Sequence, residues 1–241
     1  MIDKRKFYIN GNWINPKEKS DYHVIDPSTE KPVAVISLGN ISDVDYAVKF
    51  AKKAFQTWSI IEKKEKIILL EKLLKIYNNR WNEIAHSMSS EMGAPLDWSS
   101  NQQTASGADH IKDFIKRLKE FEFEKRFANN SNNYIVYEPI GVCGLITPWN
   151  WPINQITLKV IPALAAGCTM ILKPSEIAPL SGMLFAEIIH EAGFPAGVFN
   201  LIIGDGAGVG TDLSSHQDID MISFTGSTRA GKLISKNAAE T

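Results

Sequence analysis

The residues best suited to chemistry lie in four short loops, each of which follows an apolar run in the second half of this 241-residue chain. The first loop, residues 147–152, reads Thr-Pro-Trp-Asn-Trp-Pro. Its prolines fix the backbone around Asn150, and a fixed carboxamide can donate to an oxygen that gains negative charge during a reaction. Asparagine is also a favoured N-cap residue, so the loop alone leaves open whether Asn150 assists chemistry or caps the following helix.

The second loop, residues 173–176, places a lysine, a proline, a serine and a glutamate at the end of an apolar run. A carboxylate at the end of a strand in a dinucleotide-binding fold commonly accepts the ribose hydroxyls, and Lys173 offers a donor to the same sugar. The same residues also suit the solvated, capped start of a helix, which is the more frequent role of this composition.

The third and fourth loops are rich in glycine. Residues 204–210 carry alternating glycines, which let a backbone approach a ligand closely, but no register of them fits the dinucleotide fingerprint. Residues 226–232 match the first seven positions of a P-loop, but Leu233 stands where a hydroxyl must hold magnesium. The fourth loop therefore predicts an anion site formed by the amides of Gly226 and Ser227 at a helix start, with a P-loop phosphotransferase as a rival class of enzyme.

The composition divides the chain near residue 134. Residues 1–134 hold 21 Lys and Arg, 18 Asp and Glu and 4 Gly, whereas residues 135–241 hold 5, 9 and 12. The first part predicts helices with solvated faces, and the second predicts a buried sheet with tight turns. The net charge of −1 gives no excess of positive charge with which the chain would attract nucleic acid or an anionic membrane surface.

In the first part, an Asn-Gly-Asn turn within residues 7–14 predicts a β-hairpin. Ser42 and Asp45 have the spacing of a capping box, and the apolar residues after them predict a helix over 44–58. The other elements expected in this part are a strand at 23–25, a helix through 67–84 that ends before Gly93, a helix at 105–118, a polar turn at 129–133 and a strand at 134–137.

In the second part, short apolar strands alternate with helices. The strands are expected at 141–146, 169–172, 198–203 and 221–224, and the helices at 153–166, 180–192, 209–214 and 228–238. This alternation predicts a parallel α/β sheet with both faces covered. Ligands of such sheets bind beyond the carboxyl ends of the strands, where the four loops lie.

The cysteines and histidines indicate no further catalytic or metal centre. Cys143 and Cys168 fall in apolar surroundings with no cation near them in sequence, which favours buried thiols over a nucleophile. The five histidines show no metal-ligand spacing, so no metal is expected. Because the start of the chain lacks the apolar segment of a signal peptide and no run is long enough to span a membrane, a cytoplasmic location is expected.

Five motifs, in this order, resemble the aldehyde dehydrogenase superfamily of NAD(P)-dependent enzymes. They are residues 147–152, residues 162–167 (Pro-Ala-Leu-Ala-Ala-Gly), residues 173–176, residues 193–200 and residues 224–228 (Phe-Thr-Gly-Ser-Thr). Weaker similarity at residues 8–11 and 26–29 extends the resemblance over essentially the whole chain.

The resemblance implies a role for each matching residue. It places Asn150 in the oxyanion hole and Lys159 near the active site, and it implies NAD rather than NADP because the Glu176 carboxylate would repel a 2′-phosphate. The cofactor-binding residues that it implies are Ile146, Thr147, Pro148 and Trp149 near the nicotinamide, Lys173, Ser175 and Glu176 near the adenosine ribose, Gly206 and Gly210 near the adenine, and Phe224, Thr225, Gly226, Ser227 and Ala230 near the pyrophosphate.

The resemblance also implies the reaction, which is oxidation of an aldehyde to a carboxylic acid through a cysteine thiohemiacetal and a thioester. It places the cysteine nucleophile and the glutamate base after residue 241, so the α/β sheet is expected to be truncated before a catalytic domain. Residues 1–134 would form a helical and hairpin region with part of an oligomerisation arm, and residues 135–241 an incomplete NAD-binding domain. The complete protein would be a homodimer or homotetramer, and the alternative is a non-catalytic nucleotide-binding module.

Overall fold

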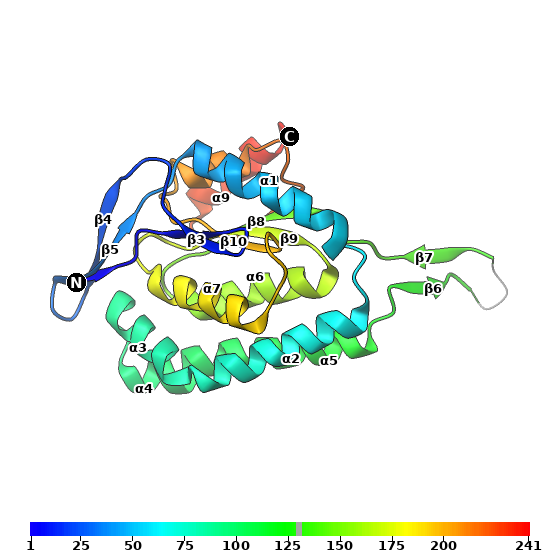
Figure 1. Cartoon of the computed structure of the whole chain (residues 1–241), viewed down its shortest axis with the longest axis horizontal. Coiled ribbons are helices and arrows are strands. Elements are labelled where there is room, and N and C mark those ends of the chain that lie inside the picture. The colour runs from blue at the N-terminus through cyan, green and yellow to red at the C-terminus, as the bar shows by residue number, and fades with distance from the viewer. Residues whose placement is uncertain (129–131) are drawn as a thin grey trace.

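The structure, a computed structural model, describes residues 1–128 and 132–241 and is built around one six-stranded sheet (Figure 1). The strand order is β11-β8-β9-β10-β2-β3. The four parallel strands are β8 (Val142–Ile146), β9 (Thr169–Lys173), β10 (Phe199–Leu201) and β11 (Met221–Phe224). Each lies where the apolar runs predicted a strand, and the parallel α/β sheet is confirmed.

The predicted hairpin in residues 7–14 extends this sheet. Its strands are β2 (Phe7–Ile9) and β3 (Asn12–Ile14), and β2 runs antiparallel to β10, with Leu201 opposite Tyr8. Asn10 and Gly11 both have positive φ, which is the backbone conformation that an Asn-Gly turn supplies. The first part of the chain therefore contributes strands to the same sheet as the second part.

Helices cover both faces of the sheet (Figure 1). One face carries α6 (Pro152–Ala166) and α7 (Leu180–Ala192), with α2 (Lys63–Asn79), α3 (Trp81–Met92) and α5 (Ala105–Glu120) packed outside them. The other face carries α1 (Ile41–Trp58), α8 (Val209–Ser214) and α9 (Thr228–Ala238). Both β8 and β9 are buried along their whole length, as expected for parallel strands between two helical layers.

Three smaller units complete the described fold. A three-stranded sheet of order β1-β5-β4 is formed by β1 (Ile2–Asp3), β5 (Lys31–Ser37) and β4 (Asp21–Asp26). A projecting two-stranded arm consists of β6 (Glu124–Arg126) and β7 (Tyr134–Val136) (Figure 1). The short helix α4 (Leu96–Trp98) and a π-helical turn (Ser99–Thr104) precede α5. Residues 129–131 of the predicted polar turn lie outside the described part of the chain.

The first helix begins earlier than predicted. Asn40, not Ser42, is its N-cap, because the Asn40 side chain accepts hydrogen bonds from the amides of Ser42 and Asp43. Asp43 completes the capping box by accepting from the Asn40 amide at 3.1 Å. The predicted capping box at Ser42 and Asp45 is therefore wrong, because the box is formed two residues earlier, by Asn40 and Asp43.

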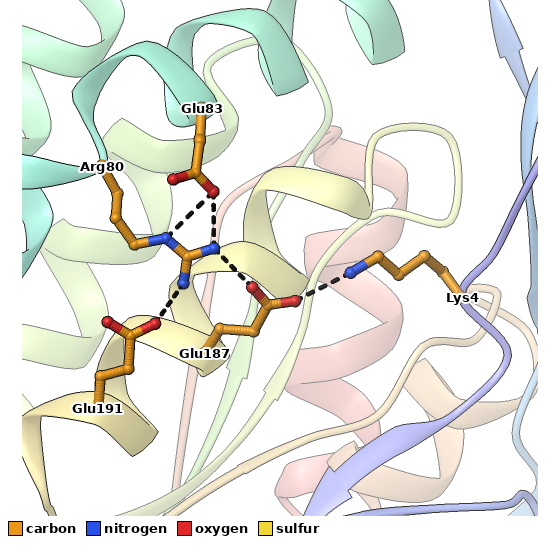
Figure 2. A network of polar contacts seen from close by, with 5 residues as sticks. All are labelled: Lys4, Arg80, Glu83, Glu187 and Glu191. Atoms are coloured by element: carbon orange, nitrogen blue, oxygen red, sulfur yellow. Dashed lines mark hydrogen bonds and ion pairs between the residues drawn. The ribbon is translucent and has the colours of Figure 1, made fainter.

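The single helix predicted through residues 67–84 is also wrong, because α2 and α3 are separated at Arg80. The Arg80 backbone (φ −99°, ψ 18°) leaves the helical region, and its guanidinium contacts Glu83, Glu187 and Glu191 (Figure 2). The predicted end of α3 is confirmed, since Gly93 closes the helix with φ +75°.

Among the described helices, none is both long and apolar enough to cross a membrane.

Candidate functional site

The carboxyl ends of three parallel strands meet at one edge of the sheet. Ile146 at the end of β8 lies opposite Lys173 of β9 and opposite Phe224 of β11. The loops that follow are joined by backbone hydrogen bonds from Thr147 to Lys173 (3.1 Å) and from Thr225 to Ile146 (3.1 Å). Thr147 and Gly226, which are 79 positions apart in sequence, therefore belong to loops at one edge, as expected for the carboxyl ends of parallel strands.

The loop after β8 combines a buried hydroxyl with exposed side chains. Thr147 is buried, and its hydroxyl has no hydrogen-bond partner among the described residues. A buried polar group without a partner costs free energy, so this hydroxyl is a candidate contact for a bound ligand. Trp149 and Asn150 are exposed beside it.

Asn150 does not cap the helix that follows. Trp151 holds the N-cap position of α6, no side chain caps this end, and Pro152 starts the helix. The alternative that Asn150 caps this helix is therefore wrong. Asn150 is instead exposed in the loop that follows β8, at the carboxyl edge of the sheet. Beside it, a pocket of about 360 Å³ is lined by Asn150, Trp98 and Trp151, whose indole rings meet edge to face with centroids 6.1 Å apart.

The loop after β9 holds a buried cation close to a carboxylate. Lys173 is only 3% exposed, and its ammonium donates to the Pro174 carbonyl (3.2 Å) and lies 3.5 Å from the Glu176 carboxylate. Burial lowers the pKa of Lys173, whereas Glu176 and Asp205 act in the opposite direction. Ser175 accepts a hydrogen bond from the Ile177 amide, so its hydroxyl stabilises the turn after the lysine.

The third loop has one glycine in open space and another beside Lys173. A Cβ atom on Gly206 would meet nothing within 4 Å, and one on Gly210 would lie about 4.0 Å from the Lys173 Cε. Asp205 shapes the loop by accepting from the Gly208 amide (2.6 Å) and, through its carbonyl, from the Gly210 amide (3.0 Å). The glycine-rich loop is therefore exposed at Gly206 and borders the Lys173 side chain at Gly210.

The loop after β11 leads into an exposed helix start. Ser227 is the N-cap of α9, and its hydroxyl accepts from the Ala230 amide at 3.2 Å. Gly226 and Ser227 are exposed residues at the amino-terminal, electrostatically positive end of this helix. The Phe224 ring packs over Gly226, where any Cβ would come within 2.5 Å of it.

Lys159 of α6 reaches the end of β11. It extends from α6 to β11, where its ammonium donates to the Ser223 hydroxyl at 3.2 Å. Burial lowers the pKa of Lys159.

Two features of the region were missed at the level of the sequence. Glu91 of α3 is fully buried and accepts hydrogen bonds from the amides of Leu180 and Ser181, which begin α7 directly after the Lys173 loop. The buried ammonium of Lys66, on α2, lies 3.6 Å from the position that a Cβ on Gly167 would occupy, next to the buried Cys168. Only the apolar pattern around these residues could have indicated burial, because their partners are distant in sequence.

A parallel α/β sheet with polar and glycine-rich loops at the carboxyl ends of its strands defines a nucleotide-binding type of fold. A search with models of known protein families identifies the family: the model of the aldehyde dehydrogenase family matches residues 13–241. The chain belongs to the aldehyde dehydrogenase family.

Several relatives match the whole chain. A 3-succinoylsemialdehyde-pyridine dehydrogenase from Pseudomonas sp. is 50% identical over 100% of this chain and 50% of its own length. The crystal structure of an aldehyde dehydrogenase from Bartonella henselae is 60% identical with a TM-score of 0.98, over 100% of this chain and 51% of that one. Aldehyde dehydrogenase C from Pseudomonas syringae, solved as a variant with NAD⁺ and octanal, is 44% identical with a TM-score of 0.95, over 98% of this chain and 48% of that one.

The chain therefore spans about half the length of the relatives that it matches. The fold of this half is that of the corresponding part of those enzymes, which confirms both the family resemblance and the α/β class expected from the sequence.

Proposed function

We propose that this chain supplies the NAD-binding half of an enzyme that oxidises an aldehyde to a carboxylic acid. The observation that carries the proposal is the meeting of the loops after Ile146, Lys173 and Phe224 at one edge. A relative with the same fold was solved with NAD⁺ and octanal, and NAD⁺ supplies a hydride acceptor when bound.

The residues at this edge fit such a dinucleotide. Within residues 1–128 and 132–241 the Thr147 hydroxyl has no hydrogen-bond partner and a Cβ on Gly206 would meet open space, while Gly226 and Ser227 are exposed at a helix start. In the proposal Ile146, Thr147, Pro148 and Trp149 lie along the nicotinamide. The other residues proposed to contact the cofactor are Lys173, Ser175 and Glu176 at the adenosine ribose, Gly206 and Gly210 at the adenine, and Phe224, Thr225, Gly226, Ser227 and Ala230 at the pyrophosphate.

Glu176 is proposed to select NAD over NADP. Its carboxylate lies beside the buried Lys173 ammonium and can accept the ribose hydroxyls, while it would repel a phosphate on the 2′-oxygen. Lys173 holds the carboxylate on the side of the loop that faces the glycine-rich segment.

Asn150 is proposed to donate one hydrogen bond to the aldehyde oxygen as that oxygen gains negative charge. Its carboxamide is free for this role because Trp151, not Asn150, holds the N-cap of α6. The neighbouring Trp98 and Trp151 rings would contact an apolar or aromatic part of the aldehyde. Lys159, whose ammonium donates to the Ser223 hydroxyl of β11, is proposed to lie near the active site of the complete enzyme.

Neither cysteine of this chain suits the thiol nucleophile of the reaction. Cys143 lies inside β8 and Cys168 directly before β9, and both are buried near the amino ends of strands whose carboxyl ends carry the loops. The thiohemiacetal and thioester would form on a cysteine outside residues 1–241. We assign the complete enzyme to the cytoplasm as a homodimer or homotetramer, with the exposed arm of β6 and β7 as the contact.

A titration of the 241-residue chain with NAD, followed by calorimetry, tests this assignment. The wild-type chain is expected to bind NAD, whereas Gly206→Val is expected to weaken binding by about tenfold or more, because its side chain enters open space that the ligand needs. Ala207→Val, an exposed neighbour, is the matched control. Failure to bind NAD, or tighter binding of ATP with magnesium, would contradict the proposal.

A further inference from the structure

A buried lysine that the proposed reaction does not use has no anionic partner. Lys66 of α2 is only 4% exposed. Among the residues that the structure describes, its ammonium forms no ion pair and no hydrogen bond. The ammonium lies 4.6 Å from the centre of the Phe123 ring. Because a buried cation without a partner costs free energy, Lys66 is a candidate contact for a bound anion.

Lys66 lines a pocket of about 540 Å³ at the surface of the chain. The wall of this pocket combines Phe55 and Ile60, at the end of α1 and just after it, with Phe123 and Tyr137, at the base of the arm. A volume of this size is within the range of about 300–1,000 Å³ that is usual for sites of small ligands. The buried ammonium is therefore part of a pocket that a small molecule can enter.

This pocket lies at the edge of the sheet opposite the proposed dinucleotide site. The Lys66 ammonium and the Cβ atom of Pro139, which also lines the pocket, are each 3.6 Å from the position that a Cβ on Gly167 would occupy. Gly167 closes α6 shortly before β9, and Pro139 precedes β8. Both residues are thus near the amino ends of strands whose carboxyl ends carry the four loops, so a ligand bound here would not occupy the cofactor site.

The charges around the pocket suit a ligand with a single negative charge. The ammonium of Lys63, a second lysine in the wall, donates to the carbonyls of Lys119 (3.2 Å) and Phe121 (3.0 Å). The Glu138 carboxylate also belongs to the wall and would repel a second negative charge on the ligand. Burial lowers the pKa of Lys66, and a bound carboxylate would act in the opposite direction.

The base of the arm gives the pocket a rigid aromatic side. The rings of Phe121 and Phe123 meet with centroids 4.9 Å apart, and those of Phe121 and Tyr137 with centroids 5.2 Å apart. The Tyr137 amide donates to the Phe123 carbonyl at 2.8 Å, which joins the two ends of the arm. An aromatic wall beside one buried cation is suited to a ligand with an apolar body and a carboxylate head.

We propose that this pocket binds a small monocarboxylate with an aromatic or apolar body, and that the Lys66 ammonium holds the carboxylate. The carboxylate accepts a charge-assisted hydrogen bond from Lys66. The body of the ligand packs between Phe123 and Tyr137 on one side and Phe55 and Ile60 on the other. This site is independent of the dinucleotide site, so its test does not depend on the proposed function.

Calorimetry of the 241-residue chain with sodium benzoate, at constant ionic strength, tests the proposal. Benzoate is expected to bind, and benzamide, which has the same ring without the charge, should bind at least about tenfold more weakly. Lys66→Met should weaken benzoate binding by about tenfold or more, whereas Lys64→Met, at an exposed lysine of the same helix, should leave it unchanged.

Several results would overturn the proposal. They are the absence of benzoate binding, equal affinities for benzoate and benzamide, tighter binding of inorganic phosphate than of benzoate, and unaltered benzoate binding in Lys66→Met. NAD binding and urea unfolding serve as controls for the fold of Lys66→Met, and the NAD affinity is expected to stay unchanged because the two sites are at opposite edges of the sheet.

A second variant keeps the test valid even if Lys66→Met unfolds. Ile60 is 80% exposed in the pocket wall, so Ile60→Glu adds a negative charge there without disturbing the core. This variant should weaken benzoate binding by about threefold or more. Ile68→Glu, at a 53% exposed residue of α2 outside the pocket, is the matched control. Equal benzoate affinities in these two variants would place benzoate elsewhere and reject the site.

Discussion

The carboxylate of Glu91 accepts a hydrogen bond from the backbone amide of Ser181 at 3.1 Å, so a residue of α3 caps the start of α7 from outside. The amide of Leu180 donates to the same carboxylate. Only three residues lie between Glu176 and Leu180, and this short connection links the ribose-binding loop of the proposal to a buried acid of the first part of the chain. Glu91 is thus a positioning residue for the edge of the sheet.

Glu91 is expected to make stability depend on pH. Burial raises its pKa to about 7, and the amides of Ser181 and Leu180 only partly offset this. The pKa of Glu91 is higher in the folded state than in the unfolded state, so between these two pKa values the folded state binds more protons. The stabilising contribution of the protonated Glu91 carboxyl is therefore lost as pH rises from about 4.5 to about 7. The loss amounts to about 3 kcal/mol.

Urea unfolding at pH 5 and pH 8 measures this effect. Glu91→Gln should show a smaller difference between the two pH values than the wild-type chain, and the exposed Glu122→Gln should behave like the wild type. A pH dependence that Glu91→Gln leaves unaltered would show that another group is responsible.

Arg80 is expected to stabilise the corner between α2 and α3. Its guanidinium contacts Glu187 and Glu191 of α7 at 2.7 Å each, and Lys4 contacts Glu187 at 2.9 Å (Figure 2). Lysine cannot reproduce this fork of hydrogen bonds, so Arg80→Lys should lower the free energy of unfolding by about 1–2 kcal/mol. Arg117→Lys, at an exposed pair with Asp113, should leave the free energy of unfolding essentially unchanged in the same urea titration.

Glu176 is expected to control the choice of dinucleotide. Glu176→Gln removes the charge that would repel a 2′-phosphate, so the ratio of the NAD and NADP affinities should fall by about tenfold. Calorimetry with both cofactors on the 241-residue chain provides the ratio. If the ratio is the same in both proteins, Glu176 does not contact the ribose.

Asn150 is expected to affect turnover and not cofactor binding. In a complete enzyme that contains this chain, Asn150→Ala should lower kcat by about 10²-fold, because one donor to the developing oxyanion is lost. The NAD affinity should stay within about twofold of the wild type. Asn101→Ala, in the exposed π-helical turn, is the control, and an undiminished kcat in Asn150→Ala would reject the oxyanion role.

The sequence predicts local elements of this fold well where one strong pattern decides them. The helix at 209–214, the strand at 221–224 and the helix at 228–238 begin and end at the predicted residues, because glycines, a serine cap and short apolar runs mark their limits. The parallel direction of the strands followed from the alternation of strands and helices, and it places the loops after the strands at one edge of the sheet.

Features that depend on distant partners were not predictable in this way. The break between α2 and α3 involves Arg80 and carboxylates more than 100 residues later. Lys66 is distant in sequence from Gly167, yet α2 packs its ammonium beside the turn at this glycine. The capping role of Glu91 likewise depends on the packing of α3 against α7, which no local pattern specifies.

Hydrogen exchange of the 241-residue chain with and without NAD tests the central claim most directly, because it reports on each loop separately. The account predicts slower amide exchange in residues 147–150, 173–177 and 225–228 when NAD is present, with no change in the arm of β6 and β7. Protection confined to other segments, or absent at saturating NAD, would contradict the assignment of this edge as the dinucleotide site.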